Sequence, residues 1–222
     1  MPIAAVIFDL DGVLVDSESL WTAAREQVTC EHGGSWREEA TRAMMGMSSP
    51  EWSHYMHESL GIPLAPEQIV HEVLQRLEAL YRRRLPLIEG AQAAVRALAA
   101  QWPLGLASSA NRTLIDLVLE LAHMRELFAA TVSAEEVAHG KPAPDVYLEA
   151  ARRLSVCPSR CAAVEDSTNG LIAAVEAGMR VIAAPNRDFP PSAEALARAD
   201  LVIDSLDGLR PHTIEALDAA RR

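Results

Sequence analysis

Three aspartates fall within eight positions of the stretch VIFDLDGVLVDSE, residues 6–18. Asp9, Asp11 and Asp16 come directly after an apolar run, at the point where a buried strand would surface. Carboxylates this close repel one another, and proteins tolerate them where a cation, a proton or catalytic chemistry offsets the repulsion. The stretch is therefore the first candidate for a functional site.

Two further apolar runs end in polar side chains. The run LASS ends at Ser108, and the run AVED ends at Glu165 and Asp166. The carboxyl ends of parallel strands meet at one edge of an open α/β sheet, where ligands bind. Residues two apart at a strand end also share one face, so we expect Asp9 and Asp11 to enter the same pocket as these residues.

Lys141 is the only lysine of the chain, and it lies in the stretch HGKPAPD. The other 19 of the 20 cationic residues are arginines. Lysine carries a compact point charge, whereas arginine carries a planar fork. The single lysine is predicted to lie near the edge of the sheet where the polar strand ends meet. This placement indicates a site that requires a point charge.

These residue types together predict a site for phosphoryl transfer. Up to four carboxylates suit a hard cation, and Mg²⁺ fits best because it accepts a few carboxylates together with waters and a substrate phosphate. Ser108 and Lys141 supply donors to an anion, and a spare carboxylate supplies a nucleophile. Catalysis of phosphoryl transfer is mostly positioning and charge neutralisation.

Each feature has a plainer explanation when it is taken alone. Acidic residues at a strand end are more often a helix cap or a solvated loop, and Gly140 and Lys141 lack the glycine spacing of a nucleotide-binding loop. His54 and His57 have no third metal ligand near them in sequence, which favours exposed helix positions. Matching polar endings on several strands, together with the sole lysine, favour the functional interpretation.

The elements that position these residues are predicted to form an α/β fold with a Rossmann-like parallel sheet and helices on both faces, because strands alternate with helices of about 10 to 15 residues. The predicted strands are 3–8, 103–109, 129–134, 161–166, 180–185 and 199–204. The predicted helices of this core are 90–101, 112–124, 143–155 and 167–178.

Between the first strand and residue 88 the pattern is helical throughout. The predicted helices are 19–33, 49–61 and 65–85, the last with Ile69, Val73, Leu77 and Leu80 on one face. We therefore expect an all-helical cap at 17–87, inserted into a core made of 1–16 and 88–222.

The amino-acid composition limits the kinds of partner and cellular compartment that we expect for the protein. The formal charge is −11 and no basic stripe stands out, so a nucleic-acid surface is not expected. Cys30, Cys157 and Cys161 have neither metal-finger nor CxxC spacing, which favours a reducing compartment. No signal peptide and no apolar stretch of about 20 residues is present, so we expect a cytoplasmic protein with no membrane partner. We expect a monomer or a weak homo-oligomer.

The sequence resembles the haloacid dehalogenase superfamily, in the branch of β-phosphoglucomutase-like phosphatases with a helical cap. Four family motifs occur in order and span nearly the whole chain. They are DxDGxxxDSE at Asp9–Glu18, a strand that ends in Ser108, Lys141 in GKPAPDVY, and Glu165 with Asp166 in VEDSTNGLIAAVEAGM.

The resemblance implies a role for each motif residue. Asp9 would attack phosphorus and become an aspartyl phosphate, and Asp11 would protonate the leaving alcohol and then activate water. Asp9, the main-chain carbonyl of Asp11, and Asp166 would bind Mg²⁺, with Glu165 a ligand or beside one. Ser108 and Lys141 would hold the phosphoryl oxygens. Substrate contacts are expected from Ser17, Trp21, Gly46, Ser48, Ser109 and Asn111, and Asp16 is expected to serve the junction to the cap.

These residues predict a Mg²⁺-dependent phosphatase that hydrolyses a small phosphate monoester, expected to be a sugar phosphate. Related mutases have an arginine where the loop GMSSPE places Ser49, and a histidine where Trp21 stands. Both departures weaken the alternative of a hexose-phosphate mutase, although Arg37 and Arg42 are the nearest cap cations in sequence. A receiver-like signalling module is a third alternative, which the position of the first aspartate and the helical insert disfavour.

Overall fold

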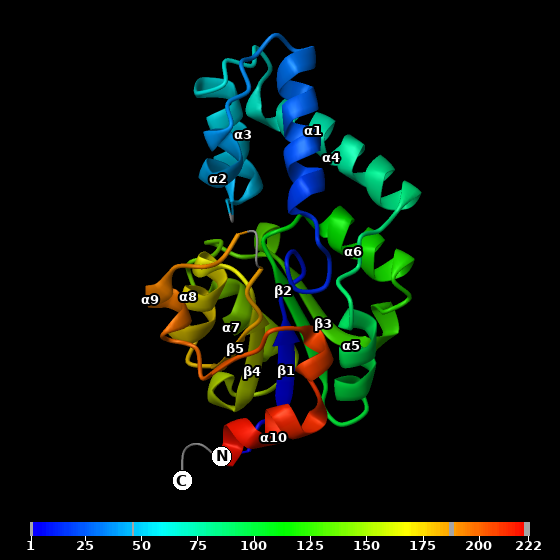
Figure 1. Cartoon of the computed structure of the whole chain (residues 1–222), viewed down its shortest axis with the longest axis vertical. Coiled ribbons are helices and arrows are strands. Elements are labelled where there is room, and N and C mark those ends of the chain that lie inside the picture. The colour runs from blue at the N-terminus through cyan, green and yellow to red at the C-terminus, as the bar shows by residue number, and fades with distance from the viewer. Residues whose placement is uncertain (1, 46, 187–188, 220–222) are drawn as a thin grey trace.

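The computed structural model describes residues 2–45, 47–186 and 189–219. Its centre is one six-stranded sheet in the order β3-β2-β1-β4-β5-β6, and every neighbouring pair of strands is parallel. The predicted parallel α/β fold is therefore confirmed (Figure 1). The strands are β1 (Ala5–Phe8), β2 (Leu104–Ser108), β3 (Phe128–Ser133), β4 (Cys161–Glu165), β5 (Arg180–Ala183) and β6 (Leu201–Val202).

Helices cover both faces of this sheet, which explains why β1 is apolar without alternation. Successive side chains of a strand point to opposite faces, so Phe8 packs into one hydrophobic core and Ile7 into the other. Figure 1 shows α5 and α6 on one side of the sheet and α7 and α8 on the other. These helices are α5 (Ala91–Ala99), α6 (Arg112–Leu121), α7 (Asp145–Arg153) and α8 (Thr168–Glu176).

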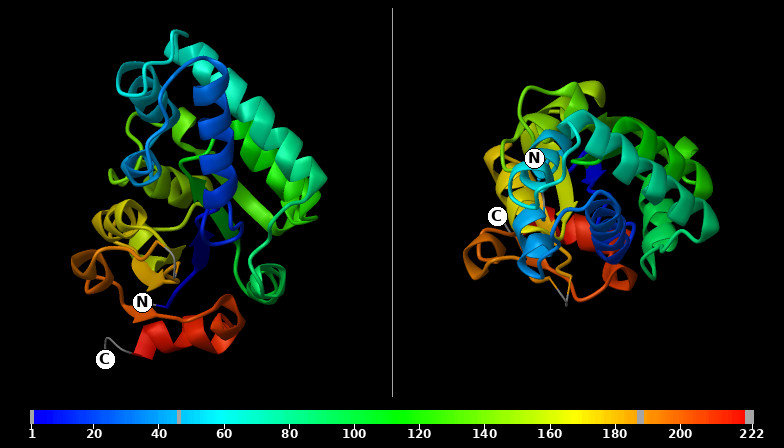
Figure 2. Two further views of the ribbon diagram at one scale, coloured as in Figure 1. Left: turned by 45° about the horizontal axis from the view of Figure 1, so that its top comes forward. Right: turned by 90° about the horizontal axis from the view of Figure 1, so that it is seen from above.

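A group of helices stands over the carboxyl ends of the strands, between β1 and α5 (Figures 1 and 2). The described residues of 17–87 contain no strand, as expected for an all-helical insert. We call this segment the cap and keep its boundaries as a prediction. Its helices are α1 (Glu18–Glu31), α2 (Glu39–Met44), α3 (Ser49–Glu58) and α4 (Pro66–Arg83).

The predicted apolar face of α4 is correct in three of its four positions. Ile69, Val73 and Leu77 are buried, but Leu80 is only partly buried and Tyr81 is buried instead. A helix turns 100° per residue, and the step from Leu77 to Tyr81 keeps the four-residue spacing of the earlier steps. The larger aromatic ring thus completes the buried face.

Two stretches of chain connect the cap to the core, and they pair with each other. Asp16 donates its backbone N–H to the carbonyl of Pro86 at 2.8 Å, and Ile88 donates to Leu14 at 3.0 Å. Val15 and Leu87 form an isolated antiparallel bridge between these two hydrogen bonds. The pairing places Asp16 at the junction to the cap, as expected.

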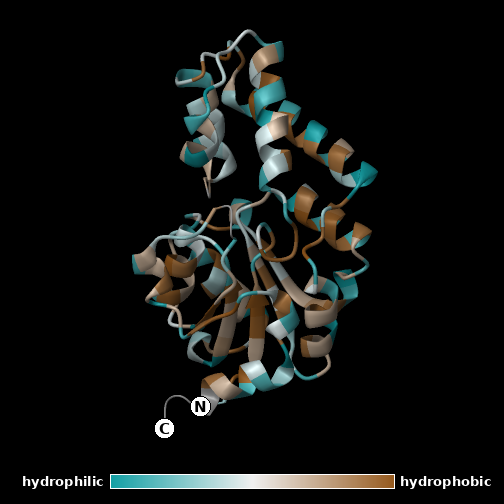
Figure 3. Cartoon of the chain, in the orientation of Figure 1, coloured by the Kyte–Doolittle hydropathy of each residue, from teal (hydrophilic) through white to brown (hydrophobic). Residues whose placement is uncertain are grey.

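Three helices were not predicted: α2, α9 (Ala193–Leu196) and α10 (Pro211–Ala219). The first two have only six and four residues, too short for an apolar period to show. Figure 3 shows hydrophobic colouring on the central strands and mixed colouring along the cap helices. Within the described residues, no helix combines the length and the apolar character that a bilayer crossing requires.

Candidate active site

Lys141 lies between two carboxylates at the carboxyl ends of β1 and β4. Its Nζ donates to Asp9 Oδ1 at 2.6 Å and to Glu165 Oε1 at 2.5 Å. All three side chains are buried, and the residue exposures are 7% for Lys141, 6% for Asp9 and 0% for Glu165. The strand ends and the sole lysine, which lie far apart in sequence, therefore meet in one cluster, as predicted.

Glu165 uses both of its oxygens inside the protein. Besides Lys141, Oε1 accepts from the Tyr147 hydroxyl at 2.8 Å. Oε2 accepts from the backbone N–H groups of Asp166 and Ser167 at 3.0 and 3.2 Å, and from the Ser167 hydroxyl at 3.1 Å. A Cβ on Gly170 would lie 1.8 Å from Oε1, so only glycine fits where α8 approaches this carboxylate.

Asp166 has a buried carboxylate oxygen, Oδ1, without a hydrogen-bond partner in the described part of the chain. Gly12 lies against the same carboxylate with φ +81°, and a Cβ there would lie 1.9 Å from Asp166 Oδ2. Carboxylate oxygens of Asp9, Glu165 and Asp166 lie within 4.8 Å of one another. An orphaned buried oxygen in a set of hard oxygen donors fits a divalent cation such as Mg²⁺.

Burial and repulsion by neighbouring carboxylates raise the pKa values of the two aspartates of this cluster, Asp9 and Asp166. Burial is the largest cause for Asp9, whose pKa is raised to about 8, and Lys141 opposes the rise while Glu165 adds to it. The pKa of Asp166 is raised well above its usual value by burial and by the neighbouring Glu165 and Asp9. Burial alone would lower the pKa of Lys141, but the two carboxylates outweigh it and the pKa is raised.

Ser17 and Trp21, at the start of the cap, orient the Asp11 side chain. The Ser17 hydroxyl donates to Asp11 Oδ1 at 2.5 Å, and Trp21 Nε1 donates to the same oxygen at 3.4 Å. Burial raises the pKa of Asp11, and these two hydrogen bonds partly offset the rise. Because both bonds end at Oδ1, Oδ2 is the oxygen left for proton exchange.

A cavity of about 310 Å³ opens above the cluster. Its floor contains Asp9, Asp11 and Lys141, and the residues at the start of α8 contribute to one wall. Predicted site residues that line it are Asp9, Asp11, Ser17, Ser109, Lys141 and Asp166. The predicted nucleophile, acid and phosphate-binding lysine therefore face one space large enough for a small phosphate ester.

The other predicted site residues that the structure describes are not among the residues that line this cavity. Ser108 is fully buried, and its Oγ accepts from the Ala110 N–H at 3.0 Å. Ser48 is the N-cap residue of α3, and its N–H and hydroxyl both donate to Glu51. Gly46, predicted to contact substrate, lies outside the described residues.

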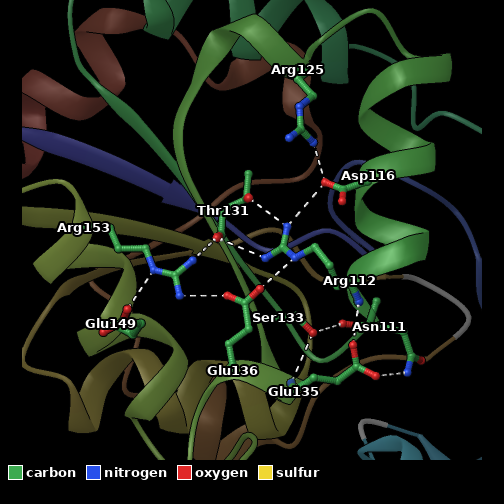
Figure 4. Close-up of polar contacts among 11 residues, drawn as sticks. Asn111, Arg112, Asp116, Arg125, Thr131, Ser133, Glu135, Glu136, Glu149 and Arg153 are labelled. Carbon is green, nitrogen blue, oxygen red and sulfur yellow. Dashed lines mark hydrogen bonds and ion pairs between the residues drawn. The ribbon is translucent and has the colours of Figure 1, made fainter.

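Asn111 joins the cap to the core. Its Oδ1 accepts from the Ser49 hydroxyl of α3 at 2.8 Å, and its Nδ2 donates to Glu135 at 2.5 Å. Figure 4 shows that Glu135 also accepts from the backbone of Arg112, whose guanidinium bonds Glu136 and Thr131. The network fixes the side chain of Asn111 from the core side, so Asn111 presents a rigid acceptor to the cap.

Sequence reasoning missed two residues that border the cavities, Glu18 and Arg25. Both lie on α1 and line a smaller cavity next to Asp11. Arg37 and Arg42, the cap cations named from the sequence, are exposed, and neither lines the two cavities next to Asp11. In sequence, Arg25 looks like any solvated arginine of an amphipathic helix, and only the tertiary structure distinguishes it.

Comparison with known proteins agrees with this geometry. A profile of haloacid dehalogenase-like hydrolases matches residues 3–178. The chain is 35% identical over 214 residues to the probable pseudouridine-5'-phosphatase of Drosophila melanogaster, covering 92% of this chain and 90% of the relative. It is 36% identical over 215 residues to hexitol phosphatase B of Escherichia coli K12, covering 93% and 94%.

A solved structure shows the same arrangement of elements. The mutant CbbY of Rhodobacter sphaeroides, solved in complex with xylulose-1,5-bisphosphate, superposes with a TM-score of 0.83 and 31% identity. The match covers 93% of this chain and 96% of that one. The likeness therefore extends over both the sheet and the helices that stand over it.

Proposed function

The chain belongs to the haloacid dehalogenase-like hydrolases, and we propose that it is a Mg²⁺-dependent phosphatase that hydrolyses a sugar phosphate through an aspartyl phosphate on Asp9. The observation that carries this proposal is Lys141, held between Asp9 and Glu165 on the floor of the cavity. A lysine that neutralises a carboxylate nucleophile also attracts the incoming phosphate.

Asp9 is the nucleophile. Lys141 fixes its Oδ1, which leaves Oδ2 to attack phosphorus. As the new O–P bond forms, the bond from phosphorus to the ester oxygen breaks, and its electron pair stays with the departing alcohol. Holding the attacking oxygen in place removes the entropic cost of bringing the reactants together.

Asp11 moves the protons. Its Oδ2 gives a proton to the departing alcohol oxygen, and the resulting carboxylate then takes a proton from the water that attacks the aspartyl phosphate. That second attack breaks the bond between phosphorus and Asp9 and releases inorganic phosphate. Ser17 and Trp21 keep the side chain oriented during both steps.

Asp9 and Asp166 are the proposed side-chain ligands of Mg²⁺, together with the main-chain carbonyl of Asp11. The bound cation would neutralise charge on the transferring phosphoryl group. Glu165 accepts five hydrogen bonds from the protein, so we assign it the task of holding Lys141 and the start of α8. Lys141 and Ser109, which line the cavity, are the proposed donors to phosphoryl oxygens, whereas the predicted donor Ser108 is fully buried and its Oγ accepts the Ala110 N–H.

A small phosphorylated sugar or polyol is the proposed substrate class. The relatives named above are a hexitol phosphatase and a probable pseudouridine-5'-phosphatase, both named for phosphate monoesters of hydroxylated compounds. The CbbY structure holds a sugar bisphosphate, so a related fold accommodates two phosphates. The mutase alternative is therefore tested alongside the phosphatase. The exposed positions of Arg37 and Arg42 favour phosphatase activity over mutase activity, because neither residue lines the cavity where it could bind a second phosphate.

The test is a screen of sugar and polyol monophosphates with Mg²⁺, measuring both inorganic phosphate and isomer exchange. We expect phosphate release without a bisphosphate activator, and no release by Asp9→Asn. Exchange faster than release would favour the mutase. Absence of both activities across the screen, with folded protein, would contradict the proposed function.

A further inference from the structure

A second, smaller cavity of about 80 Å³ lies between the cap and the core. It shares Asp11, Glu18, Met45 and Ser109 with the wall of the larger cavity, so the two spaces adjoin beside the proposed acid. Part of the leaving alcohol could therefore occupy the small cavity while the ester oxygen that Asp11 is proposed to protonate stays in the larger one. The residues that α1 and α3 add to its wall are Trp21, Arg25, Ser49 and Trp52.

Arg25 is a buried cation whose guanidinium contacts two aromatic rings. Its residue exposure is 5%, and its guanidinium carbon lies 4.6 Å from the centroid of Trp21 and 5.1 Å from that of Trp52. The cation–π contacts fix the guanidinium plane. They do not satisfy its hydrogen bonds, and among the described residues Nε has no acceptor.

Glu18 supplies a matching buried acceptor. Its Oε1 is buried and receives no hydrogen bond from the described residues. Burial raises the pKa of Glu18 and lowers that of Arg25 to about 10, while each charge favours the other. No ion pair joins the two side chains within the described part of the chain, so a donor and an acceptor border one cavity without bonding each other.

Unmade hydrogen bonds of buried charged groups are costly to a fold, and their presence beside a cavity points to a ligand that completes them. The ligand must accept from Arg25 and donate to Glu18, and hydroxyl groups do both. The volume admits only a few atoms, and the indole rings suit the C–H faces of a sugar or polyol. A second phosphate would meet two carboxylates, Glu18 and Asp11, against the single cation Arg25.

We propose that Arg25 and Glu18 are specificity-determining residues that bind hydroxyl groups of the leaving alcohol, and thereby select polyhydroxylated monophosphates over apolar esters and bisphosphates. The inference rests on the proposed phosphatase activity. It goes further in assigning substrate choice to a pair of side chains on the first cap helix, α1.

The experiment compares kcat/KM for a hexitol monophosphate with kcat/KM for p-nitrophenyl phosphate, which has no hydroxyl on its leaving group. Arg25→Met should lower the ratio of the two values by about 10- to 100-fold, the loss expected for one hydrogen bond to a charged group. The matched control is Arg42→Met, which removes an exposed arginine of the same cap and should leave the ratio at its wild-type value.

A second variant keeps the proposal testable if Arg25→Met does not fold. Glu18→Gln preserves size and should lower the same ratio, while it raises the relative turnover of a hexose bisphosphate. A ratio that stays at the wild-type value in a folded variant at either position overturns the inference. Failure of the wild type on every ester would instead refute the phosphatase activity itself, so the two failures are distinct.

Discussion

The core and cap sides of the cavity differ in how far their charged groups are already satisfied. On the core side, Lys141 bonds Asp9 and Glu165, and Glu165 accepts five hydrogen bonds in all. On the cap side, the Arg25 guanidinium lies over the rings of Trp21 and Trp52, and Arg25 Nε and Glu18 Oε1 have no hydrogen-bond partner among the described residues.

The difference separates two tasks. The core binds the phosphoryl group, which is the same in every substrate. The charged side chains of the core are therefore pre-organised, and little reorganisation accompanies the reaction. The cap contacts the alcohol, which varies between substrates. Its buried donor and acceptor are proposed to form hydrogen bonds only when a substrate with matching hydroxyl groups binds. Core changes should therefore reduce turnover of all substrates, and cap changes should alter the choice among them.

The largest expected effect comes from Asp9→Asn. The amide keeps the shape but removes the nucleophile, so kcat should fall by about 10⁴-fold or more on every ester, whatever its alcohol. Thermal unfolding measured by circular dichroism serves as the folding control. A loss that depends on the substrate would break the division of tasks between core and cap.

Lys141→Arg should cost about 10²- to 10³-fold in kcat with sugar phosphate and p-nitrophenyl phosphate alike. The planar fork does not fit the buried point between Asp9 and Glu165 without displacing the phosphoryl group. Steady-state kinetics with both esters measures the effect, and near-wild-type turnover would remove Lys141 from the proposed reaction. Arg42→Lys, an exposed exchange of the same two residue types in the cap, is the control.

Gly12→Ala tests whether Asp166 is a cation ligand. The new Cβ would lie 1.9 Å from Asp166 Oδ2, so the carboxylate must move, and we expect the Mg²⁺ concentration for half-maximal activity to rise by about 10-fold or more. Gly178→Ala is matched in backbone strain, because its φ is +75° and nothing lies within 4 Å of its Cβ position. Equal Mg²⁺ dependence in both variants would contradict the role of Asp166.

Asn111→Ala should have the smallest effect of the four. It removes the acceptor of the Ser49 hydroxyl, the hydrogen bond that joins α3 to the core, and such a bond contributes about 1 kcal/mol. We expect KM to rise by about 5-fold on sugar phosphates, with a smaller change in kcat. A large fall in kcat that is the same for all esters would place Asn111 with the core residues instead.

The sequence was most informative where topology alone decides position. Parallel strands deliver Asp9 and Glu165 to one edge whatever the details of packing, and a single lysine among arginines identified Lys141. Arg25 was missed because its burial depends on how α1, α3 and the core pack, which helical periodicity does not encode. The prediction of Leu80 rather than Tyr81 on the buried face of α4 was wrong for a related reason, because both spacings are helical and only the packed neighbours decide between them.

The most direct test of the central claim is to trap the phosphorylated enzyme. Asp11→Asn removes the base that activates water, so an aspartyl phosphate should accumulate when ³²P-labelled p-nitrophenyl phosphate, whose leaving group needs no proton, is added with Mg²⁺ and quenched in acid. We predict a hydroxylamine-labile label on the peptide that contains Asp9. Phosphate release by the wild type with no such label in the folded variant, or with the label on another peptide, would contradict the account.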